Sequence, residues 1–245
     1  MNQNIGYGAT INGKHTWRDF QLVVSNTDVV GMPEPKTIYV DIPGSSKRLD
    51  LTETLTGKCE YGPRTLSFTL GGISDMRAWP ERLSAFTRHV HGKQVRVILD
   101  SEPEYVYVGR ATVKSFERTR ALGKIELNII CEPYKQDLVS TGEDWIWDPF
   151  NFESGRILDY QNIQVTGYKK VKVEGSHMDS VPSFILTSRT PGTTQERVYS
   201  ARLKKYFNLS VGNNRFAELI IKPDGDELTF YGTYTLTIDM RGGSL

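Results

Sequence analysis

Short stretches in which apolar and polar residues alternate run through most of this chain, and they constrain its fold more than any other feature. Alternation with a period of two, or enrichment in β-branched and aromatic residues, is typical of β-strands. The first half contains QLVVS (21–25), KTIYVDI (36–42), RTLSFTL (64–70), QVRVILD (94–100), YVYVGRATVKSF (105–116) and KIELNIICE (124–132). The sequence therefore predicts a fold class that is mainly β.

Two glycine-containing segments predict where strands of the first half reverse direction. Asn12-Gly13 is expected to form a two-residue hairpin turn, because both residues tolerate positive φ. Gly123, within RALGK, predicts a second turn between the strands on either side of it.

One segment of the first half, SDMRAWPERLSAFTRHVHG (74–92), departs from the strand pattern. Pro80 suits a first helical turn, where a missing N–H costs nothing, and Gly92 suits the left-handed residue that ends a helix. Apolar residues recur at steps of four, three and four, which aligns them on one helix face: Trp79, Leu83, Phe86 and Val90. The segment predicts one α-helix in the N-terminal domain.

His89 and His91 raise the question of a metal site, because His-x-His is a familiar ligand spacing on a strand. In the predicted helix they fall in the last turn, and residues i and i+2 of a helix point about 200° apart. Two such imidazoles cannot easily chelate one ion. His15 and His177 are isolated in the sequence. We expect no metal and no other cofactor, and a helix end that favours partly cationic side chains explains the pair.

The texture changes after CEPYKQ (131–136). Residues 137–160 are aromatic and acidic without a sustained period, which indicates a crossover between domains. Turn signals such as GNN, PDGD and YGT then recur at the spacing expected of an antiparallel β-sandwich. The expected strands lie in NIQVTG, YKKVKVEG, PSFILTS, ERVYSARL, FNLSVG, RFAELIIKP, DELTFYG and TYTLTIDM. We predict an N-terminal domain at 1–136, and a linker with a C-terminal sandwich at 137–245.

Composition excludes several classes of partner. Lys and Arg total 30 against 29 Asp and Glu, so no basic excess exists to neutralise nucleic-acid phosphates or to attract a membrane surface. No apolar run approaches the roughly 20 residues that a membrane span needs, and the N-terminus has no apolar signal-peptide core. Cys59 and Cys131 are predicted to be buried thiols from a reducing cytoplasm.

No motif marks an enzyme. Neither cysteine has a neighbouring histidine to activate it, and PGSSK (43–47) lacks the spacing of a phosphate-binding loop and is expected to be a surface turn. Carboxylates interleaved with aromatic side chains leave two readings open, an inter-domain linker and a sugar-stacking cleft with acid/base groups: Asp144, Trp145, Trp147, Asp148, Phe150, Phe152 and Glu153.

The order of motifs along the chain resembles the distal tail protein family of long-tailed bacteriophages and of related prophage and tailocin particles. The opening TINGKHTWRDFQLVV, then IPG…LDLTETLTG, Y-x-x-R at 61–64, HGK at 91–93 and CEPYK at 131–135 carry this resemblance. In the second half, VKVEGSHMDSVPSFILTS and LIIKPDGDELTFYGTYTLTI resemble the galectin-like or carbohydrate-module-like sandwich that ends many members.

This resemblance implies a structural protein without catalytic residues, placed at the tail tip of the virion. Family members form a homo-hexameric ring that joins the tail tube protein to baseplate or receptor-binding proteins. The N-terminal domain builds the ring and the C-terminal sandwich decorates its outside. A different hypothesis stays open on the residues themselves, a carbohydrate-binding or sugar-cleaving β-sandwich module that contacts cell-wall polysaccharide.

Residues 41–53, DIPGSSKRLDLTE, form a long polar arm that could reach a neighbouring subunit of such a ring. An unpaired sheet edge can be satisfied between neighbours when a ring closes. A surface loop fits the same residues. We predict the oligomer interface at Asp41, Ser45, Ser46, Lys47, Arg48, Tyr61 and Arg64.

Overall fold

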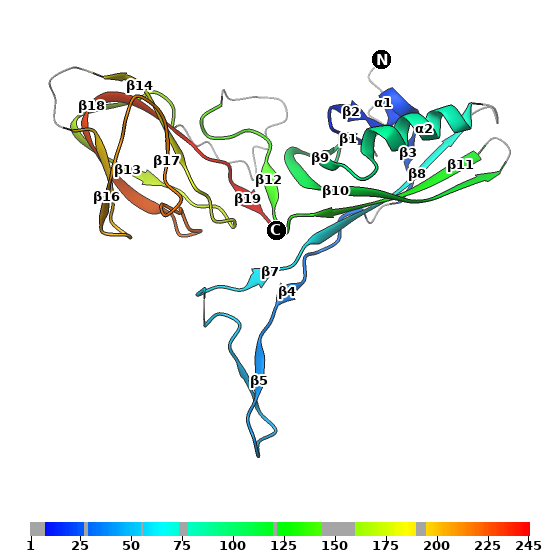
Figure 1. The fold of residues 1–245 in the computed structure, drawn as a ribbon, viewed down its shortest axis with the longest axis horizontal. Helices are drawn as coiled ribbons and strands as arrows, with labels where there is room; N and C mark the ends of the chain where they lie inside the picture. The colour runs from blue at the N-terminus through cyan, green and yellow to red at the C-terminus, as the bar shows by residue number, and fades with distance from the viewer. Residues whose placement is uncertain are drawn as a thin grey trace. The chain divides into compact units, whose positions relative to one another are not determined.

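The computed structural model describes residues 8–26, 29–54, 56–73, 78–119, 122–143, 160–189 and 195–245. The chain divides into two compact units, Met1–Lys135 with Leu245 and Gln136–Ser244. Both are built from antiparallel strands (Figure 1), so the prediction of a mainly β fold is confirmed. That residues 1–136 and 137–245 fold as independent domains stays a prediction.

The first unit is organised by one antiparallel sheet with strand order β2-β1-β9-β10-β11-β8-β3. Asn12 and Gly13 have φ of 47° and 78° and connect its first hairpin, as predicted. The strands are β1 (Ala9–Ile11), β2 (Lys14–His15), β3 (Val23–Val24), β8 (Arg64–Ile73), β9 (Gln94–Leu99), β10 (Glu102–Thr119) and β11 (Leu122–Cys131).

Helix α2 (Trp79–Val90) covers one face of this sheet (Figure 1). Its apolar stripe lies in the core: Trp79, Phe86 and Val90 are fully buried and Leu83 packs beside them. Pro80 occupies the first turn, and Gly92 follows the helix with φ of 74°. The predicted helix and its buried face are confirmed. Strand residues complete the core, among them Leu66, Phe68, Leu70, Val97, Tyr107, Ile125, Leu127 and Ile129.

Gly123 is not in a turn, contrary to the prediction. It lies within β11, where it pairs with Gly72 of β8 and Arg118 of β10. The ring of Trp79 packs directly over it, and a Cβ added at Gly123 would lie 2.6 Å from that ring. The glycine is therefore needed for close packing of helix on sheet rather than for chain reversal.

A second helix, α1 (Thr16–Phe20), was not predicted, so the expectation of a single helix is wrong. Nδ1 of His15 caps it by accepting hydrogen bonds from the backbone N–H groups of Trp17 (3.1 Å) and Arg18 (3.2 Å). Nε2 of the same ring lies 3.0 Å from the Asp100 carboxylate. Five residues are too few to show a helical period, and histidine is not among the usual N-cap residues.

The second unit contains a 6-stranded antiparallel sheet with order β16-β15-β18-β14-β17, and β13 pairs with β18. The predicted C-terminal β-sandwich is confirmed at this level. The strands are β13 (Ile163–Val173), β14 (Ser183–Arg189), β15 (Arg197–Ser200), β16 (Lys205–Asn208), β17 (Gly212–Arg215) and β18 (Asp226–Asp239). Its core includes Val165, Val173, Phe184, Val198, Phe207, Leu228, Phe230, Leu236 and Ile238.

Several strand limits in this unit differ from the prediction. YGT is not a turn: β18 continues through it, as β13 continues through Gly167. Gly167 and Gly232 face each other across the ladder with φ of 76° and 126°, so a paired bend replaces the two predicted breaks. GNN lies in β17 instead of a turn. Residues 216–222, where a strand was predicted, contain a turn and an isolated bridge from Ile221 to Ser180.

The start of the predicted crossover belongs to the second unit. The hydroxyl of Thr141 donates to the Ile238 carbonyl (2.8 Å), and the Thr141 amide donates to the Met240 carbonyl (3.0 Å). Just before it lies β12 (Lys135–Asp137), and β19 (Gly243–Ser244) closes the chain. The carboxylates and aromatic residues proposed for a sugar cleft, from Asp144 to Glu153, lie outside the described residues. Across the part of the chain that is described, none of the helices has the length and apolarity to cross a membrane.

Candidate assembly surface

Between β3 and β8 the chain leaves the sheet of the first unit as a long two-stranded arm (Figure 1). At its base β4 (Pro35–Lys36) pairs with β7 (Glu60–Tyr61), and at its far end β5 (Tyr39–Asp41) pairs with β6 (Arg48–Asp50). We call residues 34–62 the arm.

Thr52 ties the two strands of the arm together between these ladders. Its hydroxyl accepts a hydrogen bond from the Ile38 amide (3.1 Å), and its amide donates to Oδ1 of Asp50 (2.9 Å). Hydrogen bonding from Thr52 lowers the pKa of the Asp50 carboxyl. The Leu51 amide also donates to the Ile38 carbonyl (2.8 Å), so the arm has a defined register.

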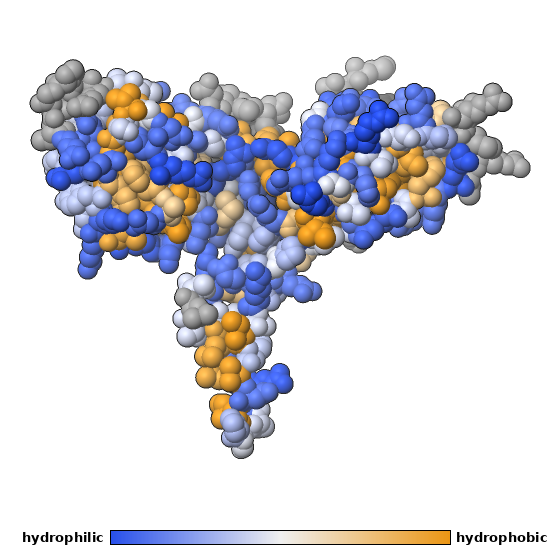
Figure 2. All heavy atoms as spheres, in the orientation of Figure 1, coloured by the Kyte–Doolittle hydropathy of each residue, from blue (hydrophilic) through white to orange (hydrophobic). Residues whose placement is uncertain are grey.

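The arm presents an apolar face that none of the described residues of its own unit covers. Every residue from 34 to 50 is exposed. Val40 is paired with Leu49, and because side chains alternate along a strand, Ile38 and Ile42 lie on the same side as Val40. These four side chains, which we call the apolar face of the arm, are 43–50% exposed, and Figure 2 shows apolar residues gathered along the arm: Ile38, Val40, Ile42 and Leu49.

Exposure on this scale is costly for an isolated hairpin. A two-stranded hairpin is at best marginally stable in water, and its outer edges carry unpaired N–H and C=O groups. Burial of apolar area contributes roughly 25 cal/mol per Å², and the arm gains little of it from the described residues of its own unit. The arrangement therefore favours a surface that is completed by another protein chain.

The predicted interface residues fall in two places. At the far end of the arm, Nε of Arg48 and Oδ1 of Asp41 form an ion pair of 2.9 Å between highly exposed side chains. Oγ of Ser45 accepts from the Lys47 amide (3.0 Å) and orders the turn, in which Ser46 is also exposed. These five residues are brought together by the structure.

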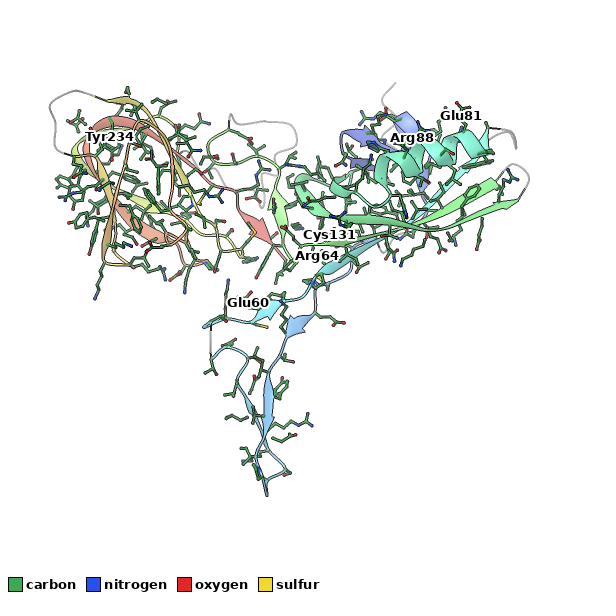
Figure 3. The ribbon with its side chains drawn as sticks, in the orientation of Figure 1. Glu60, Arg64, Glu81, Arg88, Cys131 and Tyr234 are labelled. Carbon is green, nitrogen blue, oxygen red and sulfur yellow. The ribbon has the colours of Figure 1, made fainter. Side chains whose placement is uncertain are left out.

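Tyr61 and Arg64 lie at the base of the arm, away from that cluster (Figure 3 labels Arg64). Tyr61 is half-buried and packs edge-on against the ring of Tyr134, with centroids 6.1 Å apart. Arg64 is 2% exposed, and its guanidinium lies 5.6 Å from the centre of the Tyr107 ring. Burial raises the pKa of the neighbouring Cys131 thiol to about 12. In the chain as folded, Arg64 offers no surface of its own.

A shallow hollow of about 470 Å³ lies beside this base, lined by residues of the arm and of the sheet. Lys36 and Tyr61 contribute from the arm, and Val108, Arg110 and Ile130 contribute from the sheet. Ile130 is 59% exposed, so β11 presents an apolar side chain beside the base of the arm.

His89 and His91 each make a hydrogen bond to the backbone of the first unit. Nε2 of His89 hydrogen-bonds to the Ile11 carbonyl (2.7 Å), whereas Nδ1 of His91 accepts from the Val113 amide (3.0 Å). The two rings thus interact with different strands. Within the described ranges, no three His, Cys, Asp or Glu side chains are grouped to hold a metal ion.

Sequence reasoning missed the apolar face of the arm. KTIYVDI reads as an ordinary half-buried strand, and the predicted interface took only Asp41 from it, with none of its apolar residues. A usable signal was present in the flanking prolines, Pro33, Pro35 and Pro43, which disfavour the interior of a sheet and are typical of edges.

No protein-family model matches this sequence, and no curated protein matches it. Among solved structures, the chain is similar to the Dit protein (gp 19.1) of SPP1, described as a paradigm of the hub adsorption apparatus in phages that infect Gram-positive bacteria. The TM-score is 0.66 at 13% sequence identity, and the match covers 98% of this chain and 99% of that one. The chain therefore has a Dit-like fold over nearly its whole length.

Proposed function

We propose that this chain is a non-enzymatic structural protein of a phage or phage-derived tail, where it forms the hub at the distal tip. The observation that carries the proposal is the match in fold to SPP1 Dit, which spans both units and leaves almost no part of either chain unmatched. A shared carbohydrate-module-like domain alone would match only one unit.

In this proposal six copies form a ring through the first unit, and the ring joins the tail tube protein to baseplate or receptor-binding proteins. The arm supports the assignment of ring building to the first unit. Its apolar face is exposed in the single chain, and a ring places an identical neighbour beside every subunit, which could bury that face. We propose that the apolar face of the arm, with Asp41, Ser45, Ser46, Lys47 and Arg48 around it, contacts an adjacent copy.

Light scattering coupled to size-exclusion chromatography tests the ring directly. The molar mass measured by light scattering should be six times the 27.8 kDa mass of one chain. Residues 1–136 alone should assemble, and residues 137–245 alone should stay monomeric. Assembly by the C-terminal fragment only would contradict the proposal.

A single substitution on the apolar face tests the role of the arm. Val40→Asp should shift the elution towards monomer, because a charge in a buried interface is left unpaired. Thr54→Asp adds the same charge to an exposed position of the same arm and should leave assembly intact. Deletion of Ser45 to Arg48 should weaken assembly more than it lowers the melting temperature of the subunit. Equal behaviour of Val40→Asp and Thr54→Asp would remove the arm from the interface.

A further inference from the structure

The outward face of the sheet in the second unit carries tyrosines gathered around one arginine. Val198, Phe207 and Phe230 point inward and are buried, so the residues that alternate with them point outward. In one row across the strands, Tyr168 of β13 pairs with Tyr231 of β18, which pairs with Arg197 of β15. In the next row Tyr199 pairs with Tyr206 of β16. We call these the tyrosine–arginine cluster: Tyr168, Arg197, Tyr199, Tyr206 and Tyr231.

Arg197 lies over two of these rings. Its guanidinium carbon is 4.4 Å from the centre of the Tyr206 ring and 5.3 Å from that of Tyr231. Tyr206 is in turn 4.7 Å from Tyr199 and 6.0 Å from Tyr231, centre to centre. A guanidinium that stacks through its face keeps the N–H groups of its edge available, and that edge matches a carboxylate or phosphate in two-point geometry.

Arg197 is the one cation among the five residues of the cluster. Among the described residues, Arg197 has no carboxylate within ion-pair distance, whereas nearby Lys170 pairs with Glu227 at 2.8 Å. The pKa of Tyr231 is raised by burial and by the Tyr206 hydroxyl, while Arg197 and Lys170 oppose the rise, so both cations lie near that phenol. An anion placed at Arg197 would therefore meet the Arg197 guanidinium and phenolic hydroxyls.

The tyrosine rings of this cluster are more exposed than expected for cross-strand pairs that only stabilise a sheet. Tyr168 is 68% exposed and Tyr206 is 48% exposed. In the described part of the chain, the ring of Tyr168 packs against no other ring. Tyrosine rings combine an apolar face with a polar hydroxyl, and the exposed face of such a ring suits the C–H face of a sugar ring.

From this geometry we propose that the tyrosine–arginine cluster binds an anionic polysaccharide. The rings of Tyr168 and Tyr206 stack against sugar rings, and the edge of Arg197 pairs with a carboxylate or phosphate that the sugar carries. A neutral sugar would leave Arg197 unpaired. This inference does not depend on the hub function, because it uses only the surface of the second unit.

Calorimetric titration of the full chain with three probes tests the proposal. Hexagalacturonate offers sugar rings and carboxylates, maltohexaose offers sugar rings alone, and a linear hexaphosphate offers charge alone. Hexagalacturonate should bind most tightly. Arg197→Ala and Tyr206→Ala should each weaken it about tenfold, the size expected for one charge-assisted contact or one stacked ring. Tyr206→Phe keeps the ring and should bind within about twofold of the unaltered chain.

Two further variants keep the result interpretable. Tyr168→Ala removes an exposed ring without a ring contact of its own, so it should weaken binding while leaving the melting temperature unchanged. Lys124→Ala removes one exposed cation from the first unit and should change nothing. The proposal is overturned if hexagalacturonate does not bind at millimolar concentration. It is also overturned if the hexaphosphate binds equally well and the tyrosine substitutions have no effect, which would indicate charge attraction without stacking.

Discussion

Helix α2 and the arm both carry regularly spaced apolar side chains in the first unit, but those of α2 are buried and those of the arm are exposed. In α2 the side chains of Trp79, Phe86 and Val90 are fully buried against the sheet. In the arm Val40 and Leu49 are 45% and 50% exposed. The same kind of pattern is satisfied inside the chain in one case and left unsatisfied in the other. In the proposed function, the difference separates residues that hold the subunit together from residues that contact an adjacent copy.

The largest loss of subunit stability is expected at Phe86. Phe86→Ala removes a fully buried ring that meets Phe20 edge-on at 5.3 Å. We expect the free energy of unfolding to fall by about 3–5 kcal/mol, as for other buried aromatic truncations. Arg88→Ala, on the exposed side of the same helix, should stay within about 0.5 kcal/mol. Chemical denaturation measures both, and a loss below about 1 kcal/mol for Phe86→Ala would place the α2 stripe at the surface.

The reactivity of the two cysteines compares the core of the first unit with the arm. Cys131 lies in the core with its pKa raised to about 12 by burial, whereas Cys59 lies in the arm and is half-buried. Only the thiolate reacts, so a thiol reagent at pH 8 should modify Cys59 at least about a hundredfold faster than Cys131. Mass spectrometry of labelled peptides measures the ratio, and Cys59→Ser should abolish the fast phase.

The raised pKa of Cys131 also fixes the direction of a pH effect. The folded state favours the protonated thiol, so this contribution to stability is complete below the unfolded pKa of about 8.5. It is lost as the pH rises from there towards about 12. Between pH 8 and pH 10, the unaltered chain should lose more unfolding free energy than Cys131→Ala does. An equal loss in both would mean that the thiol is solvated.

These contrasts show which parts of the fold the sequence could predict. The stripe of α2 and the Asn12-Gly13 turn were predicted correctly, because each depends on a local pattern. Gly123 and Gly232 were misread as turn residues, since the sequence shows that a glycine is present but not what packs against it. The cap at α1 was missed because it depends on His15, which is also fixed by Asp100, a residue distant in the sequence.

The candidate site shows the same division. Residues 41–53 could be singled out as an arm from their polar composition and turn residues. The alternation of Ile38, Val40 and Ile42 could not reveal exposure, because a core strand has the same pattern. Arg64 was predicted to lie at the interface together with the arm, yet the structure buries it beside Tyr107.

A smaller effect is expected where α2 meets the sheet. Gly123→Ala would place a Cβ 2.6 Å from the Trp79 ring, so either the ring or β11 must shift. Overpacking of this kind typically costs about 1–3 kcal/mol. Gly71→Ala is the matched control, because Gly71 lies in the adjacent strand and an added Cβ there would have no heavy atom within 4 Å. Similar unfolding free energies for the two variants would show that Trp79 is not tightly packed.

The smallest effect on the subunit is expected at the far end of the arm. Asp41 and Arg48 form an exposed ion pair of 2.9 Å, and such pairs contribute at most about 1 kcal/mol. Asp41→Ala or Arg48→Ala should therefore barely change the melting temperature of a monomeric sample.

If the arm lies against an adjacent copy, however, the pair loses solvent when the assembly forms, and each substitution leaves the other charge unpaired. Each should then lower the stability of the assembly, measured by dilution, more than that of the subunit. The exchanged variant Asp41→Arg with Arg48→Asp keeps the pair within the arm and should recover part of the loss. Equal small effects on assembly and on subunit melting would leave the tip in solvent and confine the interface to the apolar face.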